Sequence, residues 1–269
     1  DSEGAQVRTS VVPESTVFYD RQEINLVSSK VVRDQNQLGL WPSDVFEQLK
    51  VGSILTIDFN SLLLVITSVG NDSVSATVLN GGAVGDNKAV TLFPSVVLPA
   101  LSEKDKLAVK IGKEFGIKDF ALSFANTPKD VLELRSLAGL KSNIISKIES
   151  KKGVRNLNEI LKVTDAILID RGDLSREVPL ENIPLIQKQI IKRTKHSNKN
   201  VYVATNLLES MMVNNKPTRA EVNDVVNTLI DGASGLVLAA ETAIGKQPVK
   251  SVDMLRSLIS RFQLYYPNY

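Results

Sequence analysis

The chain has 269 residues, of which 43% are hydrophobic and 23% are charged, a composition typical of a soluble globular protein of one or two domains. Its formal net charge of +2 gives no electrostatic reason to expect nucleic acid binding, and no apolar run approaches the ~18 residues that indicate a membrane span. Because cysteine is absent, disulfides and cysteine-based metal sites are excluded. No targeting segment is visible, so we expect a soluble protein of the cytoplasm or of an organelle interior.

Residues 10–98 carry short runs with the alternating pattern of β-strands. The strands that we expect there are 53–58, 62–68, 73–79 and 88–92. Turn residues such as Asn80 with Gly81 separate them, and no helical repeat longer than a turn or two interrupts them. This part of the sequence therefore predicts a small all-β module.

From about residue 101 the pattern changes to alternating strands and helices. The expected strands are 120–124, 144–148, 166–169, 201–205 and 236–240, and the expected helices are 103–115, 154–163, 184–195 and 219–231. Thr218 and Glu221 form a capping-box pattern before the last of these helices. The spacing is typical of βαβ units, so we expect parallel strands joined by right-handed crossovers.

Polar residues stand at the ends of three of these strands. Lys147 and Glu149 are two residues apart on one strand, so their side chains point to the same face, and Asp173 and Thr205 follow two further apolar runs. Parallel strands bring their carboxyl ends to one edge, where α/β proteins place their sites. Two carboxylates and an ammonium group suit a magnesium ion and a transferring phosphoryl group. A Lys-x-Glu pair alone is usually a surface ion pair, so this prediction depends on the four residues being together.

The number of strands does not complete a barrel. A (β/α)8 barrel needs eight strands in typically ~250 residues, and residues 101–262 supply only five. Residues 1–9 have the pattern of the end of a further strand and of the exit into the all-β module. We therefore expect an incomplete chain, with the sheet completed by upstream sequence or by another polypeptide.

The motifs themselves resemble those of a known family. Segments 144–178 and 203–249 resemble the core of pyruvate kinases, segments 80–82 and 98–102 match the end of that family's lid domain, and segment 1–9 matches the entry to the lid. The resemblance covers nearly the whole chain in order. In that family the fold also has two earlier strands, most of a third, and a carboxyl-terminal regulatory domain, none of which this sequence contains.

The resemblance implies an α/β fold, namely an incomplete TIM (β/α)8 barrel of the pyruvate kinase type with an inserted small β-barrel lid. Residues 1–9 would be the end of the third barrel strand, residues 10–98 the lid domain, and residues 99–269 barrel strands four to eight with their helices.

The implied function is that of a glycolytic phosphotransferase, which in its complete form converts phosphoenolpyruvate and ADP to pyruvate and ATP with Mg²⁺ or Mn²⁺ and with K⁺. A homo- or hetero-oligomer is expected, without nucleic acid or membrane partners. Two alternatives stay open. One is a pyruvate kinase-like protein with lost or altered activity that serves as a scaffold or complex subunit, and the other is a metal-dependent lyase or aldolase acting on the pyruvate enolate.

The resemblance also assigns roles to individual residues. Lys147 resembles the lysine that stabilises the transferring phosphoryl group and the enolate, and Thr205 resembles the residue beside the face of the enol where a proton is delivered. Glu149 and Asp173 resemble the ligands of the divalent metal. The remaining assignments are Ser123, Gly172, Asp173 and Thr205 for substrate binding, Asp1 and Ser2 for the potassium ion, and Arg8 and Lys88 for the nucleotide phosphates.

Several residues depart from the family pattern. Asp170 replaces a small residue, Ser175 replaces a glycine, and Phe59 with Asn60 replaces an acidic-glycine turn, which removes a carboxylate from the nucleotide site. Added charge at Asp170, and added bulk at Ser175 and Ala240, would crowd or repel an anionic substrate if these side chains face the site. We therefore expect metal and enolate chemistry to be retained and nucleotide handling to be weakened.

Overall fold

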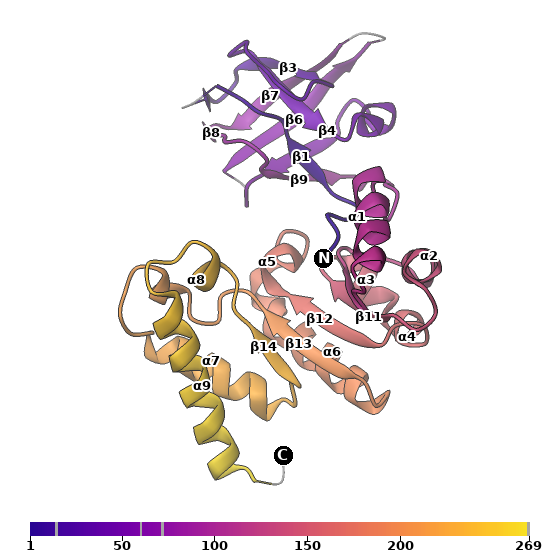
Figure 1. The fold of residues 1–269 in the computed structure, drawn as a ribbon. Coiled ribbons are helices and arrows are strands. Elements are labelled where there is room, and N and C mark those ends of the chain that lie inside the picture. Colours follow the sequence, from indigo (N-terminus) through magenta and orange to yellow (C-terminus); the bar gives the residue numbers. More distant parts are fainter. Residues whose placement is uncertain (14–15, 60, 71–72, 268–269) are drawn as a thin grey trace. The chain divides into compact units, whose positions relative to one another are not determined.

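The computed structural model of the protein describes residues 1–13, 16–59, 61–70 and 73–267. They form two compact units, shown as ribbons in Figure 1. The barrel unit is Ala5–Pro99, and the sheet unit consists of Asp1–Gly4 with Ala100–Tyr269. Among the described residues, no helix combines the length and the apolar character that crossing a membrane requires.

The barrel unit contains a closed barrel of seven strands in the order β1-β4-β3-β7-β6-β5-β9. Its strands are β1 (Val7–Thr9), β3 (Glu23–Val27), β4 (Gln37–Trp41), β5 (Ile54–Ile57), β6 (Leu62–Val69), β7 (Val74–Asn80) and β9 (Ala89–Phe93). A short pair of strands, β2 (Val17–Phe18) and β8 (Gly82–Ala83), and the 3-10 helix η1 (Ser43–Gln48) lie outside the barrel order. Alternate residues of each strand fill the core; in β6 these are Leu62, Leu64 and Ile66, all almost fully buried.

The predicted all-β module is thus a closed barrel, and four of its strands lie within one or two residues of the predicted bounds. The strand β1 lies in the segment 1–9, for which the sequence predicts a strand end and the exit into the all-β module. Val7–Thr9 pairs antiparallel with β4 and β9 inside the barrel unit, and it does not end a strand of the parallel sheet. Only the first residues run beside that sheet, where the Ser2 N–H donates to the Ala121 carbonyl oxygen at 3.0 Å. A run of three residues is too short for a period-two pattern to identify its partners.

The glycines predicted to form a turn are required by close packing. A Cβ atom at Gly82 would overlap the carbonyl oxygen of Ser61, so no larger residue fits there without a backbone shift.

The sheet unit is built on five parallel strands in the order β10-β11-β12-β13-β14, which confirms the predicted α/β class. These strands are β10 (Asp119–Leu122), β11 (Asn143–Ile148), β12 (Ala166–Asp170), β13 (Asn200–Ala204) and β14 (Gly235–Val237). Their register aligns Ile148 with Ile169, and Asp170 with Ala204. The residues that follow β11, β12 and β13 therefore leave the sheet at the same edge.

Helices connect these strands and cover the sheet (Figure 1). They are α1 (Glu103–Glu114), α2 (Pro128–Ala138), α3 (Lys151–Arg155), α4 (Leu157–Leu161), α5 (Arg171–Leu174), η2 (Leu180–Asn182), α6 (Ile183–His196), η3 (Glu209–Met212), α7 (Arg219–Ile230), α8 (Ala240–Ala243) and α9 (Pro248–Tyr265). The predicted capping box of Thr218 and Glu221 is confirmed at the start of α7. The predicted helix 154–163 is wrong in one respect, because it is divided into α3 and α4 at Asn156. The Asn156 side chain donates to the Asn126 carbonyl oxygen at 2.7 Å, a contact with a distant loop that sequence periodicity does not contain.

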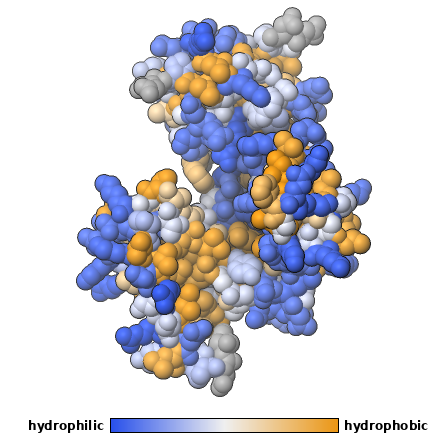
Figure 2. Space-filling view, viewed as in Figure 1, coloured by the Kyte–Doolittle hydropathy of each residue, from blue (hydrophilic) through white to orange (hydrophobic). Residues whose placement is uncertain are grey.

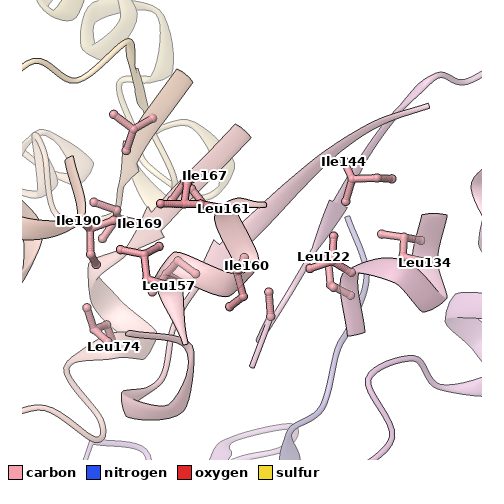
Figure 3. Packing of buried hydrophobic residues seen from close by; sticks show 14 of the residues in the cluster. Leu122, Leu134, Ile144, Leu157, Ile160, Leu161, Ile167, Ile169, Leu174 and Ile190 are labelled. Carbon is pink, nitrogen blue, oxygen red and sulfur yellow. The ribbon is translucent and has the colours of Figure 1, made fainter. Parts of the chain in front are cut away.

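Branched aliphatic side chains of the strands and helices interlock in the core of the sheet unit (Figure 3). Those labelled in the figure are Leu122, Leu134, Ile144, Leu157, Ile160, Leu161, Ile167, Ile169, Leu174 and Ile190. Each of them is 4% exposed or less. This packing holds the carboxyl ends of the strands, and the polar residues that follow them, in defined positions.

Candidate active site

Lys147 and Glu149 form an ion pair at the end of β11. The Lys147 Nζ lies 2.9 Å from the Glu149 Oε1, and the two side chains are only 12% and 0% exposed. The other oxygen of Glu149, Oε2, accepts a hydrogen bond from the Phe124 N–H at 2.6 Å. Burial raises the pKa of the Glu149 carboxyl to about 7, although the Lys147 charge and the Phe124 N–H act in the opposite direction. Among the described residues, no hydrogen bond of acceptable geometry reaches the buried Oε1.

Three carboxylates gather at this edge of the sheet. Glu149, Asp170 and Asp173 each offer an oxygen, and these oxygens lie within 4.8 Å of one another. Arg176 holds Asp173 through an ion pair of 2.9 Å. Closely spaced carboxylates suit a hard divalent cation, because they supply oxygen ligands and a cation would relieve their mutual repulsion. The buried Oε1 of Glu149 accepts no hydrogen bond of acceptable geometry from the described residues and is available to coordinate a metal ion. The residues present therefore fit Mg²⁺ or Mn²⁺.

A second group of polar residues surrounds Lys147. Its Nζ donates to the Asp1 Oδ2 and to the Ser123 Oγ, both at 3.2 Å. The Ser123 Oγ in turn lies 3.0 Å from the Asp1 Oδ1 and 2.8 Å from the Ser2 carbonyl oxygen. The Ser123 N–H donates to the Ser2 Oγ at 2.9 Å. Asp1, Ser2, Ser123 and Lys147 therefore form one continuous polar network.

Thr205 connects the end of β13 to the carboxylates. Its hydroxyl donates to the Asp170 Oδ1 at 2.6 Å. The same oxygen accepts hydrogen bonds from the N–H groups of Gly172 and Asp173 at 3.2 and 3.5 Å. Arg171 donates to the Thr205 carbonyl oxygen through two nitrogens, at 3.0 and 2.6 Å. The structure thus brings together every predicted site residue that belongs to the sheet unit.

Comparison with known proteins identifies the family to which this arrangement belongs. The family model described as the barrel domain of pyruvate kinase matches residues 1–252. The chain belongs to the pyruvate kinase family.

Individual pyruvate kinases are similar over most of this chain. Those of Thermotoga maritima and Clostridium perfringens are 34% and 38% identical to it, over 95% and 82% of this chain and 56% and 48% of their own lengths. A plastidial pyruvate kinase 3 (chloroplastic) of Arabidopsis thaliana is 33% identical over 99% of this chain and 48% of its own length. The chain spans about half the length of the curated relatives it matches.

Asp170 is one of the residues that depart from the family pattern. The sequence predicts that its charge repels an anionic substrate if the side chain faces the site. In this structure three donors satisfy its carboxylate, and it joins the acidic cluster. An aspartate directly before a short helix is a strong N-cap, and this signal in the sequence predicts such hydrogen bonds. Ser175 also departs from expectation, because its hydroxyl donates to the Gly172 carbonyl oxygen at 2.7 Å and is therefore committed within the helix.

Arg8 and Lys88, the two residues assigned to nucleotide phosphates, lie in the barrel unit. An Arg8 side-chain nitrogen donates to the Asn87 carbonyl oxygen at 3.1 Å, and the Lys88 Nζ lies 3.0 Å from the Asp58 Oδ2. A carboxylate therefore remains beside Lys88, next to the altered turn that begins at Phe59. Asn60, the other altered residue of that turn, lies outside the described residues.

Proposed function

We propose that this protein, in its complete form, transfers the phosphoryl group of phosphoenolpyruvate to ADP. Membership of the pyruvate kinase family supports this reaction. The structural observation that supports it most is the buried pair of Lys147 and Glu149 beside Asp173, because it combines a fixed positive charge with metal-binding carboxylates.

Glu149 and Asp173 would hold Mg²⁺ or Mn²⁺ in this proposal, and Asp1 with Ser2 would contribute to a K⁺ site. A divalent ion bound there would neutralise the charge of the phosphoryl and enolate oxygens. Carboxylate and hydroxyl oxygens are the ligands that such hard cations prefer.

Lys147 would stabilise the reacting group directly. During transfer the bond from phosphorus to the enol oxygen breaks and a bond from phosphorus to an ADP oxygen forms, which leaves an enolate that takes a proton at its methylene carbon to give pyruvate. The ammonium group of Lys147 would offset the negative charge on both the phosphoryl group and the enolate. Thr205 would lie beside the carbon that receives the proton, and Ser123 would contact the substrate phosphate.

The finer architecture is also part of the proposal. The five parallel strands would be strands four to eight of a (β/α)8 barrel, residues 1–9 would include the end of the third strand, and the barrel unit would be the inserted lid that carries Arg8 and Lys88 to the nucleotide phosphates. The chain order supports this, because the sheet unit is formed by segments on both sides of the barrel unit. Strands outside the present sequence, or in a partner, would complete the barrel.

A pyruvate kinase-like subunit without activity is the second candidate. The specific observation that favours it is Asp170, whose carboxylate occupies the backbone donors expected to bind substrate.

A coupled assay of pyruvate formation from phosphoenolpyruvate and ADP, with the full-length protein and Mg²⁺, tests the proposal. We expect activity in the wild type and a loss of at least about 100-fold in kcat/KM for Glu149→Gln and for Asp173→Asn. Glu159→Gln is the matched control, because it makes the same chemical change at an exposed residue whose side chain pairs with Lys162. A wild type without activity that still binds Mn²⁺ would favour the inactive subunit.

A further inference from the structure

The side chain of Asp170 lies where a bound carboxylate is expected. A single oxygen, Oδ1, accepts hydrogen bonds from the Thr205 hydroxyl and from the N–H groups of Gly172 and Asp173. Gly172, Asp173 and Thr205 are the residues assigned to substrate binding, and N–H and hydroxyl donors of this kind suit a carboxylate. A carboxylate of the chain itself and a carboxylate of a ligand are the same chemical group, so they compete for the same donors.

The donors are held in place by contacts that do not involve Asp170. Thr205 has a left-handed backbone conformation, with φ at 75°. A β-branched residue adopts this conformation only where surrounding contacts hold it. Arg171 maintains it through two hydrogen bonds to the Thr205 carbonyl oxygen, and Arg171 is itself anchored by Asp224 at 2.7 Å. Removal of the Asp170 carboxylate would therefore leave a preorganised group of three free donors.

A second feature marks the same place as a ligand site. The Oε1 of Glu149 is buried and accepts no hydrogen bond of acceptable geometry from the described residues, and Glu149 belongs to the carboxylate cluster that includes Asp170. Its nearest charged partner is the Lys147 Nζ at 2.9 Å, so the oxygen is neutralised by an ion pair and remains available as a ligand atom.

We propose that Asp170 is an internal substitute for the carboxylate of the substrate. It occupies the three donors in the free protein and must turn away before a small 2-oxo or 2-enol carboxylate binds. The inference rests on the proposed function and adds that this chain binds its substrate weakly. The tethered carboxylate of Asp170 competes for the donors at an effective concentration of roughly millimolar or more. The negative charge of Asp170 also repels an anionic ligand.

Two substitutions separate occupation of the donors from simple charge repulsion. Asp170→Ala removes both the charge and the acceptor, whereas Asp170→Asn removes the charge and keeps an oxygen that accepts the same hydrogen bonds. Asp253→Ala, at an exposed position of α9, is the control for the loss of one negative charge.

The measurement is the affinity for pyruvate of the full-length protein loaded with Mn²⁺, followed through the water-proton relaxation of the bound ion. We expect Asp170→Ala to bind pyruvate at least about 10-fold more tightly than the wild type, with Asp170→Asn between them and Asp253→Ala unchanged. Hydrogen exchange gives a readout that does not need the metal. The amides of Gly172 and Asp173 should exchange faster in Asp170→Ala, and pyruvate should protect them again.

The possible failures are distinguishable. If Mn²⁺ binds but pyruvate has equal affinity for the wild type and for Asp170→Ala, Asp170 does not occupy the substrate position. This result overturns the inference about Asp170 and leaves the proposed function standing. If Asp170→Asn binds pyruvate as tightly as Asp170→Ala, charge repulsion explains the effect and occupation of the donors is overturned. If neither protein binds Mn²⁺, the proposed function fails, and the inference fails with it.

Discussion

At the scale of single residues, Gly172 shows how closely the candidate site is packed. A Cβ atom at this position would lie 2.9 Å from the Cγ2 of Thr205, which is shorter than carbon atoms tolerate. Thr205 cannot retreat freely, because its backbone is held by Arg171. A glycine is therefore required next to this threonine, although α5 would otherwise favour alanine.

We expect Gly172→Ala to lower the free energy of unfolding by about 1–3 kcal/mol, because the added methyl group overpacks this contact. In a Thr205→Ser background the Cγ2 atom is absent, so the same substitution should cost clearly less. Urea denaturation of the wild type, both single variants and the double variant measures this coupling. Equal costs in the two backgrounds would show that the Thr205 methyl group does not determine the requirement for glycine.

The roles of the predicted site residues differ in how far the sequence could determine them. The proximity of Lys147 and Glu149 follows from the period of a strand, and their distance of 2.9 Å agrees with that argument. The N-cap pattern accounts for the hydrogen bonds of Asp170 with Gly172 and Asp173. Its hydrogen bond with Thr205 follows from no local pattern, because Thr205 is 35 residues away and only the register of β12 and β13 brings the two together. The catalytic and metal-binding roles of these residues stay predictions.

At the scale of secondary-structure elements, Asp165 joins three segments around β11. Its Oδ2 accepts hydrogen bonds from the Arg135 side chain of α2 and from the Ile144 N–H of β11, both at 2.7 Å. Partial burial alone would raise the pKa of Asp165, but these hydrogen bonds and the charges of Arg135 and Lys199 lower it below its usual value. The carboxylate is thus more favourable in the folded protein than in the unfolded chain.

This contribution should depend on pH. Because the pKa of Asp165 is lower in the folded state, the stabilisation is complete above the unfolded-state pKa of about 4 and disappears as the pH falls through the folded-state pKa. We expect Asp165→Asn to lower the thermal midpoint at pH 7, by an amount that corresponds to about 1 kcal/mol or less because the side chain is partly exposed to solvent. The difference from the wild type should narrow as the pH falls below about 4.

Thermal unfolding of both proteins between pH 3 and pH 7 checks this expectation. Glu159→Gln is the control, because its exposed pair with Lys162 should contribute little at any pH. A difference that stays constant or grows in acid would contradict the role of the Asp165 charge.

At the scale of the whole molecule, each unit has its own hydrophobic core, and the two were distinguishable in the sequence by their period. The parallel sheet does not close. Its outer strands, β10 and β14, each pair with one neighbour among the described strands, and all three residues of β14 are half-buried. Apolar side chains are visible on the surface of the sheet unit in Figure 2. Unpaired backbone groups and exposed apolar faces at a sheet edge promote association with further chain.

We therefore expect the 269-residue segment, expressed alone, to be insoluble or unable to transfer phosphate. Five strands cannot form a closed eight-strand barrel, and the proposed reaction needs positive charge on more than one side of the phosphoryl group. A coupled assay of ATP formation from phosphoenolpyruvate, run beside the full-length protein, measures this. Robust magnesium-dependent ATP formation by the isolated segment would prove the expectation wrong.

The sequence by itself determined the α/β class, the separate all-β module and the strands whose ends carry Lys147, Glu149 and Asp173, because these features depend on residues close together along the chain. Only the tertiary structure decided that Val7–Thr9 belongs to the small barrel, that a helix is divided at Asn156, and that Asp170 accepts a hydrogen bond from Thr205. Each of these depends on contacts between residues at least 30 positions apart. Local periodicity does not contain such contacts, since they arise only when packing and strand register bring distant segments together.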